Sequence, residues 1–130
     1  MTVPEPTATP VTLYGIPTCD TVKRARAWLA QHAPAVAFHD FKRAGVPVQR
    51  LDAWMAAVGW ERLVNRHGTT WRRLSDEQRA AVVDARSASR TLLEHPSLIK
   101  RPVVEWADRS ITVGFDPQDW ATRATRPLKA

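Results

Sequence analysis

The amino-acid sequence predicts a single α/β domain with the element order β-α-β, a helical insert, and then β-β-α. Three observations carry this prediction. A short apolar run near the N-terminus ends at a glycine and a proline, the residues after it repeat apolar positions with helical spacing, and two apolar runs near the C-terminus enclose a turn. The 130 residues, of which 44% are apolar, are enough for one packed core.

The first three elements follow a polar N-terminal segment. Residues 1–10 contain three prolines and are expected to form a flexible tail. Residues 11–14 have the pattern of a buried strand, and a helix is expected to start at Cys19 and to end before Pro34. A second strand is expected at 36–41. The apolar stripe of the helix consists of Val22, Ala25, Leu29 and His32.

The middle of the chain is expected to form a helical insert at about 47–95. Its first helix has one apolar face and is closed by Gly59, a residue type that favours helix C-termini. Residues 65–71 are polar, contain a glycine and are expected to form a loop. The apolar face consists of Leu51, Trp54, Met55 and Val58.

A second long helix of the insert is expected to begin at Ser75. Ser75 and Gln78 have the spacing of a capping box, in which each side chain bonds the backbone N–H of the other residue. The helix is expected to include residues 82–83 and to run to about Leu93, with a break near 87–89.

Two further strands and a helix complete the predicted domain. The strands are expected at 102–106 and 110–115, joined by a tight turn at Asp108-Arg109 because aspartate tolerates turn conformations. Asp116-Pro117 is expected to start the final short helix.

These elements predict one domain over residues 11–121, followed by a C-terminal tail at 122–130. A parallel βαβ unit followed by a hairpin and a closing helix is the arrangement of the thioredoxin fold. The helical insert would then precede the hairpin.

Composition narrows the classes of function. The net charge is +6, but 15 of the 19 cations are scattered arginines, so a specific nucleic-acid role is not expected. No stretch has the roughly 20 apolar residues of a membrane span, and the N-terminus lacks the pattern of a secretory signal. With one cysteine there is no internal disulfide. We therefore expect a cytoplasmic monomer.

Cys19 is the main candidate for chemistry. It follows the strand and opens a helix, where unpaired N–H groups and the helix dipole stabilise a thiolate. Lys23, one turn later on the same face, would add positive charge. Because the position three residues after Cys19 is Val22, any disulfide must form with another molecule and be resolved by an external thiol. Glutathione is the expected thiol. The alternative is an inert, buried cysteine.

Arginines supply the other candidates. The Asn65-Arg66-His67 and Lys100-Arg101-Pro102 clusters contain guanidinium groups, which donate paired hydrogen bonds to oxyanions. Arg101 precedes a proline at the start of a predicted strand, and a cis Arg101-Pro102 bond is compatible with the low cost of cis X–Pro bonds. The four histidines have no ligand spacing, so no metal site is expected, nor is a bound cofactor.

Three blocks resemble the arsenate reductase-like ArsC/Spx superfamily, and specifically its YffB-like branch. In chain order these are LYGIPTCDTVK at 13–23, LVNRHGTTWR at 63–72 and HPSLIKRPV at 95–103. The resemblance spans about residues 11–121. It implies a thioredoxin-like core with a helical insert.

The resemblance also implies a function. Cys19 would be the redox cysteine, with Arg101 beside it before the cis Pro102, in a glutathione-dependent thiol/disulfide reductase. Lys23 and Arg101 would assist Cys19, while Thr18, Asn65, Arg66, Arg101 and Pro102 would bind glutathione or another small thiol or disulfide substrate. Glutaredoxin is a further candidate partner.

Two other activities are known among proteins of this superfamily. Arsenate reductases use three arginines, of which Arg101 matches one; Asn65 stands at the second position, and Phe115 and Asp116 stand near the third. Arsenate reduction is therefore not favoured. Spx-type proteins bind RNA polymerase and use a Cys-x-x-Cys switch, which Val22 removes here. A non-enzymatic protein-binding module remains the alternative.

Overall fold

The computed structural model describes residues 11–33 and 35–125. The chain forms two compact units, one from the described parts of 1–40 and 101–130 and the other from 41–100. The predicted helical insert at 47–95 falls within the second unit. The tail expected at 1–10, the helix stop expected at Pro34 and the last five residues lie outside the described residues.

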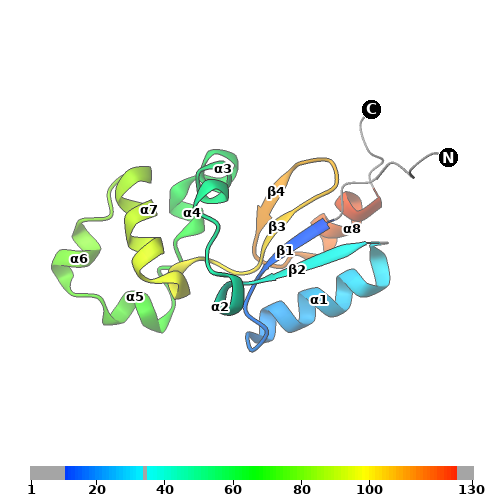
Figure 1. Cartoon of the computed structure of the whole chain (residues 1–130), viewed down its shortest axis with the longest axis horizontal. Coiled ribbons are helices and arrows are strands. Elements are labelled where there is room, and N and C mark those ends of the chain that lie inside the picture. The colour runs from blue at the N-terminus through cyan, green and yellow to red at the C-terminus, as the bar shows by residue number, and fades with distance from the viewer. Residues whose placement is uncertain (1–10, 34, 126–130) are drawn as a thin grey trace. The chain divides into compact units, whose positions relative to one another are not determined.

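The first unit is a four-stranded sheet with two helices (Figure 1). The strand order is β2-β1-β3-β4; β1 and β2 are parallel, and the other neighbours are antiparallel. This confirms the thioredoxin-like α/β fold and its β-α-β…β-β-α order. The elements are β1 (Val11–Gly15), α1 (Asp20–His32), β2 (Val36–Asp40), β3 (Val103–Glu105), β4 (Ile111–Val113) and α8 (Pro117–Thr125).

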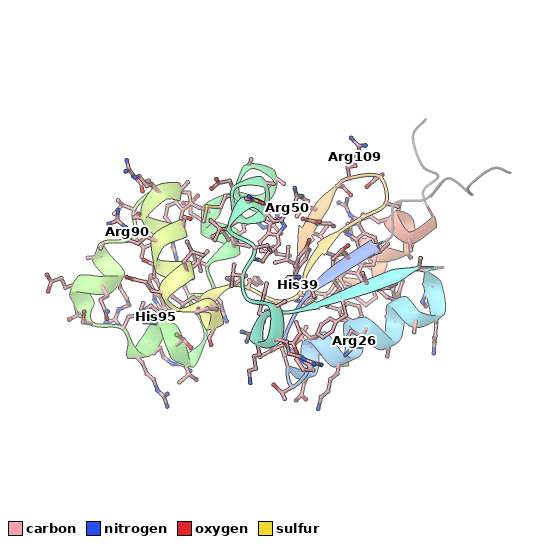
Figure 2. The ribbon with its side chains drawn as sticks, viewed as in Figure 1. Arg26, His39, Arg50, Arg90, His95 and Arg109 are labelled. Atoms are coloured by element: carbon pink, nitrogen blue, oxygen red, sulfur yellow. The ribbon has the colours of Figure 1, made fainter. Side chains whose placement is uncertain are left out.

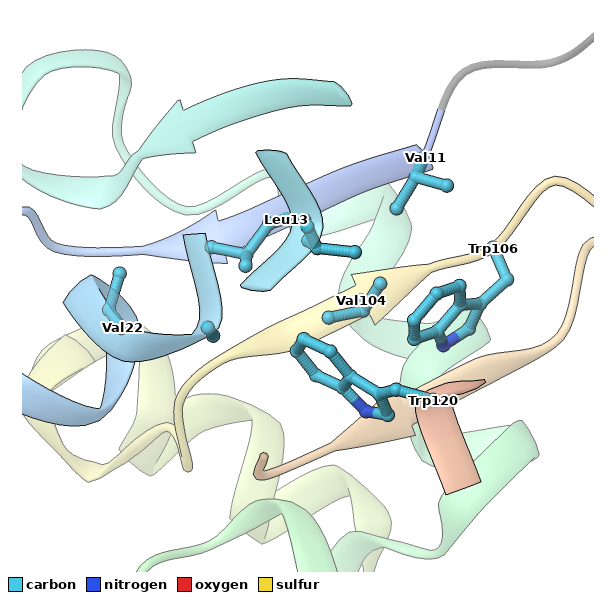
Figure 3. Close-up of a cluster of buried hydrophobic side chains, with 8 residues drawn as sticks. Val11, Leu13, Val22, Val104, Trp106 and Trp120 are labelled. Carbon is cyan, nitrogen blue, oxygen red and sulfur yellow. The ribbon is translucent and has the colours of Figure 1, made fainter. Parts of the chain in front are cut away.

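The core of the first unit lies where α1 and α8 pack on one face of the sheet. Alternate residues of β1 and β3 point into it, as the period-two geometry of strands requires. Figure 3 shows Trp106 and Trp120 in this cluster, and Trp120 is fully buried with its ring edge-on to Trp106 and Phe115, at centroid distances of 5.1 and 4.8 Å. The cluster consists of Val11, Leu13, Val22, Ala25, Leu29, Val104, Trp106 and Trp120.

The predicted stripe of α1 is correct for three of its four members. Val22, Ala25 and Leu29 are fully buried, but His32 is exposed. The His32 ring stacks on Trp28 at 3.9 Å, and its Nδ1 lies 2.7 Å from the Trp28 carbonyl oxygen. The imidazole therefore finds its packing and hydrogen-bond partner on the surface of its own helix. On the polar side of α1, the Arg26 guanidinium lies 4.0 Å from the Phe38 ring (Figure 2).

The turn between β3 and β4 is one residue longer than the predicted pair. The Arg109 amide donates to the Trp106 carbonyl, and the Trp106 amide donates to that of Ser110. Arg109, at the tip of the hairpin in Figure 2, takes a positive φ of 73°. Asp108 instead accepts hydrogen bonds from the amide and hydroxyl of Ser110. This is the three-residue hairpin, a turn followed by one left-handed residue.

The ends of several elements also differ from the predicted boundaries. β3 and β4 are shorter than the strands expected at 102–106 and 110–115. The second strand stops at Asp40, since Phe41 begins the next helix and is buried. The closing helix α8 continues to Thr125, beyond the expected domain end at 121. Asp116 starts this helix as predicted, with its Oδ1 accepting hydrogen bonds from the amides of Gln118 and Asp119 at 3.2 and 3.3 Å.

The second unit is helical. Leu51, Trp54 and Met55 are buried, as predicted for the face of α3, whereas Val58, the fourth predicted member, is half-buried. Gly59 follows that helix with a positive φ of 90°. Within the described residues, no helix is long and apolar enough to span a membrane. The elements are α2 (Phe41–Ala44), α3 (Val48–Val58), α4 (Trp60–Leu63), α5 (Thr69–Arg73), α6 (Asp76–Ala80), α7 (Ala85–Glu94) and the 3₁₀ turn η1 (Pro96–Leu98).

Two predictions for this unit were wrong. The polar segment 65–71 is a loop only as far as Gly68, after which α5 begins. The helix expected from Ser75 to Leu93 is two helices, with the break at Ala81–Asp84 rather than at 87–89.

A second capping box explains why the break between the two helices lies at Ala81–Asp84 and not at 87–89. Besides the Ser75–Gln78 box, which is present as predicted, Asp84 and Ser87 cap each other. The Ser87 amide donates to Asp84 Oδ1 at 2.8 Å, and the Asp84 amide donates to Ser87 Oγ at 3.1 Å. Since Asp84 takes an extended conformation as N-cap, the chain starts a new helix there.

Candidate active site

Cys19 is the N-cap residue of α1. It has an extended backbone conformation, and its carbonyl accepts the first helical hydrogen bond, from the Lys23 amide at 2.9 Å. The side chain makes no capping hydrogen bond, is half-buried and packs against the core of the first unit. The cysteine therefore stands at the positive end of a 13-residue helix.

The position of Cys19 depends on a close contact between β1 and α1. Gly15 is buried at the end of β1, and a Cβ built on it would lie 2.8 Å from Cγ2 of Val22. Only glycine allows the strand end to approach the first turn of the helix this closely. Val22 occupies the place where a second cysteine of a Cys-x-x-Cys motif would stand, and it is fully buried.

Arg101 and Pro102 directly precede β3, the strand that pairs with β1. The Arg101-Pro102 bond is cis, as the sequence indicated. The antiparallel pairing of β1 and β3 ends at Tyr14 and Val103. Arg101 and Pro102 therefore lead into β3 at the same end of the sheet at which β1 leads toward Cys19.

Arg101 and Pro102 differ in how deeply they are buried. Arg101 is half-buried, with its Nε atom excluded from solvent, and Pro102 is buried. The Pro102 carbonyl accepts a hydrogen bond from the Gly114 amide at 2.9 Å, which fixes the start of β3 against the end of β4. Thr18 and Lys23, the other predicted members of the site, are exposed on either side of Cys19 in the sequence.

Asn65 and Arg66 belong to the second unit. The side-chain Oδ1 of Asn65 accepts a hydrogen bond from the backbone N–H of His67 at 3.1 Å. The backbone N–H of Asn65 donates to the carbonyl of Leu98 at 2.7 Å. The Arg66 guanidinium lies over the rings of Trp60 and Trp71, at 5.4 and 5.9 Å. Asn65 therefore shapes its own loop, while Arg66 is exposed and packed on aromatic faces.

Phe115 and Asp116 both have structural roles at the start of α8. Phe115 packs its ring on Trp120, and Asp116 caps α8 through its Oδ1. Neither residue supplies the cation that an arginine would bring to this position.

Sequence reasoning missed a basic cavity in the second unit. Arg62 and Lys100 both line it, although 38 positions separate them in the chain. The apolar pairs next to them, Leu63-Val64 and Leu98-Ile99, are too short to predict a contact between segments so far apart in the chain. Val64 and Ile99 do form an isolated antiparallel bridge. No cluster of three or more metal-ligating side chains occurs in residues 11–33 and 35–125.

The fold and the site together define a thioredoxin-like protein with one cysteine at the start of its first helix. The model of the ArsC family matches residues 14–123, and the chain belongs to that family. At the level of the family, this supports a thiol-based reductase.

Three relatives are similar over almost their whole length. An uncharacterized protein from Haemophilus influenzae is 40% identical over 110 residues, which are 85% of this chain and 95% of the relative. The solved structure of a YffB (PA3664) protein is 43% identical, with a TM-score of 0.82 over 88% of this chain and 99% of that one. An ArsC-related protein from Brucella melitensis is 43% identical, with a TM-score of 0.68 over 91% and 97%. The similarity to the YffB protein supports the YffB-like branch.

Proposed function

We propose that this chain is a glutathione-dependent thiol/disulfide reductase that works with Cys19 alone. The observation that carries the proposal is the placement of the only cysteine at the N-terminus of α1, with buried Val22 where a second thiol would stand. Membership of the ArsC family supports a thiol-based reductase in general.

The reaction takes two thiol–disulfide exchanges. The Cys19 thiolate attacks the glutathione sulfur of a mixed disulfide, forming a Cys19–glutathione disulfide and releasing the substrate thiolate, which takes a proton from water. A glutathione thiolate then attacks the glutathione sulfur of that adduct, so that oxidised glutathione leaves and the Cys19 thiolate is regenerated. Two glutathione sulfurs end in the oxidised disulfide while the substrate sulfur is reduced.

Arg101 is the residue that we assign to substrate binding. It leads into β3 at the end of the sheet from which β1 leads to Cys19, and its guanidinium fork can bind a carboxylate of glutathione through two hydrogen bonds. Lys23 and the helix N-terminus stabilise the thiolate. Thr18 and Pro102 flank the sulfur and the arginine in this proposal, while Asn65 and Arg66 remain candidates for a second contact.

Arsenate is a poorer candidate substrate. Of the three positions that bear arginine in arsenate reductases, only position 101 has one here, because Asn65 and the Phe115-Asp116 pair occupy the other two. A tetrahedral oxyanion would therefore lack most of its charge complement.

The test compares two disulfides. One is a glutathionylated peptide, which carries carboxylates and is turned over in the presence of glutathione. The other is the uncharged hydroxyethyl disulfide, reacted in a single turnover without glutathione, because glutathione would convert it into a mixed disulfide with the same carboxylates. Cys19→Ser should abolish turnover of both and should yield no glutathione adduct by mass spectrometry. Arg101→Gln should raise KM for the charged substrate by about 10- to 100-fold, the worth of a hydrogen bond to a charged group, and leave the uncharged one nearly unchanged.

A matched control uses an arginine of the same unit at the hairpin tip. Arg109→Gln removes the same charge from an exposed position and should leave both substrates unaffected. Full turnover by Cys19→Ser would refute the mechanism. Equal effects of Arg101→Gln on both disulfides would refute the carboxylate contact. Capture of RNA polymerase subunits by the chain, unchanged in Cys19→Ser and without turnover of either disulfide, would favour the protein-binding alternative.

A further inference from the structure

The positive charge of this chain is concentrated in the second unit. Residues 41–100 contain 11 Lys and Arg against 6 Asp and Glu, a net charge of +5 out of the total of +6. The described part of the first unit has 6 of each and is balanced. This segregation means that the excess charge is not a uniform bias of composition.

Part of this charge converges on a cavity. A hollow of about 230 Å³ in the second unit is lined by three cationic side chains, a histidine and one carboxylate. Ligand pockets for drug-sized molecules are about 300–1,000 Å³, so this one suits a smaller ligand. With neutral histidine, the ionic lining carries a net charge of +2. It includes Glu61, Arg62, Asn65, Arg66, His67 and Lys100.

Backbone pairing holds the two ends of this lining together. The Asn65 amide donates to the Leu98 carbonyl at 2.7 Å, and the Lys100 amide donates to that of Leu63 at 2.8 Å. The buried pair Val64 and Ile99 lies between these bonds. The side chains on the rim therefore project from a fixed backbone and not from a free loop.

The charged groups of Arg62 and Lys100 have no interaction partner among the described residues. Both are exposed, and in the part of the chain that the structure describes neither side chain makes a hydrogen bond or an ion pair. Arg66, by contrast, packs over Trp60 and Trp71. Two uncommitted cations at one hollow repel each other, and an anion between them would remove that repulsion.

We propose that this cavity binds a small dianion bearing carboxylate or phosphate oxygens, with Arg62 and Lys100 as its principal contacts. Arg62 can donate two parallel hydrogen bonds to such a group, and Lys100 supplies a point charge. The net lining charge of +2 matches a dianion. The lining shares Asn65 and Arg66 with the candidate second contact for glutathione, but Arg62 and Lys100 take no part in the proposed reductase reaction, and binding of these anions does not require Cys19.

The test is a titration of the ¹⁵N-labelled full chain followed by amide chemical shifts. The probes are inorganic phosphate, succinate and chloride at equal ionic strength and pH. We expect saturable shifts at the amides of Asn65, His67 and Lys100 with phosphate or succinate, and no saturation with chloride. Saturation by phosphate alone identifies a phosphate group as the ligand chemistry, and saturation by succinate alone identifies a dicarboxylate.

Matched variants separate the cavity from general charge. Arg62→Gln with Lys100→Gln should weaken binding by about tenfold or more, while Arg73→Gln with Arg86→Gln removes two exposed cations from outside the lining and should change it less than about twofold. Glu61→Gln should tighten binding by about threefold because it removes a repulsive charge. An increase in affinity cannot result from a misfolded variant.

Three results would overturn the proposal. They are the absence of saturation with both oxyanions, equal weakening by the two double variants, and saturable binding of duplex DNA by a chain that binds neither phosphate nor succinate. The last would show that the basic unit serves a nucleic acid and not a small anion.

Discussion

The contact between Gly15 and Val22 predicts a specific energetic coupling between two positions that flank Cys19. Gly15→Ala would place a methyl group 2.8 Å from Val22 Cγ2 and 3.4 Å from its Cγ1, closer than carbon atoms tolerate. Overpacking of this kind costs about 1–3 kcal/mol, and about 0.4–1 kcal/mol returns because alanine restricts the unfolded chain. The single variant should therefore lose about 1–2 kcal/mol of unfolding free energy.

Val22→Ala has the opposite defect. It removes two methyl groups from a fully buried side chain, which at about 0.8 kcal/mol per group, with a cavity cost added, amounts to about 2–3 kcal/mol. In the double variant the methyl group added at position 15 enters the space that the valine side chain vacates. We expect the double variant to lose about 2 kcal/mol, where additive effects would give about 3–5 kcal/mol.

The assay is urea unfolding of the four proteins of this double-mutant cycle, followed by far-ultraviolet circular dichroism. Equal m values across the four show that the unfolding transition keeps its character. Additivity within about 0.5 kcal/mol would refute the steric argument. The alkylation rate of Cys19 in each protein provides a second readout, since a displaced helix start would move the sulfur.

Two further predictions concern stability. Hydrogen bonds from the Ser87 amide and hydroxyl lower the pKa of Asp84, so this carboxylate stabilises the folded chain above its ordinary pKa of about 3.9 and loses that effect as pH falls through the lowered folded value. Asp84→Asn should match the wild type near neutral pH and should lose less thermal stability than the wild type between about pH 5 and 3; parallel pH profiles would contradict this. Trp120→Ala should lose about 3–5 kcal/mol, measured by urea unfolding, because Trp120 is fully buried against three aromatic rings, and a loss below about 1.5 kcal/mol would show that the cluster repacks.

Local patterns were sufficient to predict much of the fold. The stripe of α1 and the apolar face of α3 follow from helical spacing. The β1–β2 and β3–β4 pairings follow from one parallel βαβ unit and one hairpin, whereas the β1–β3 pairing that joins them has no local signal. The break at Ala81–Asp84 was missed because aspartate and serine three apart can cap a helix or lie within one. Only the backbone conformation of Asp84 decides between these.

The candidate site was predictable to a different degree. Cys19 stands at a strand-to-helix boundary that the sequence marks with glycine and proline, so its place at a helix N-terminus could be derived from local signals. The place of Arg101 at the same end of the sheet depends on strand pairing, which the sequence indicated only through its resemblance to a family. The convergence of Arg62 and Lys100 depends on one long-range bridge at Val64 and Ile99, and no local pattern encodes that contact.

The presence of Val22 in place of a second thiol has a consequence for how oxidation of this protein is measured. Since these 130 residues contain one cysteine, a disulfide formed at Cys19 always joins two molecules, and its product is heavier than the reduced chain. A dithiol site loses only two hydrogen atoms when it forms its internal disulfide, so its oxidised fraction follows a potential alone. Here the fraction follows the concentration of the partner thiol as well, and dilution at constant potential changes it. Intact-mass spectra would therefore record the oxidation state of Cys19 together with the identity of its partner.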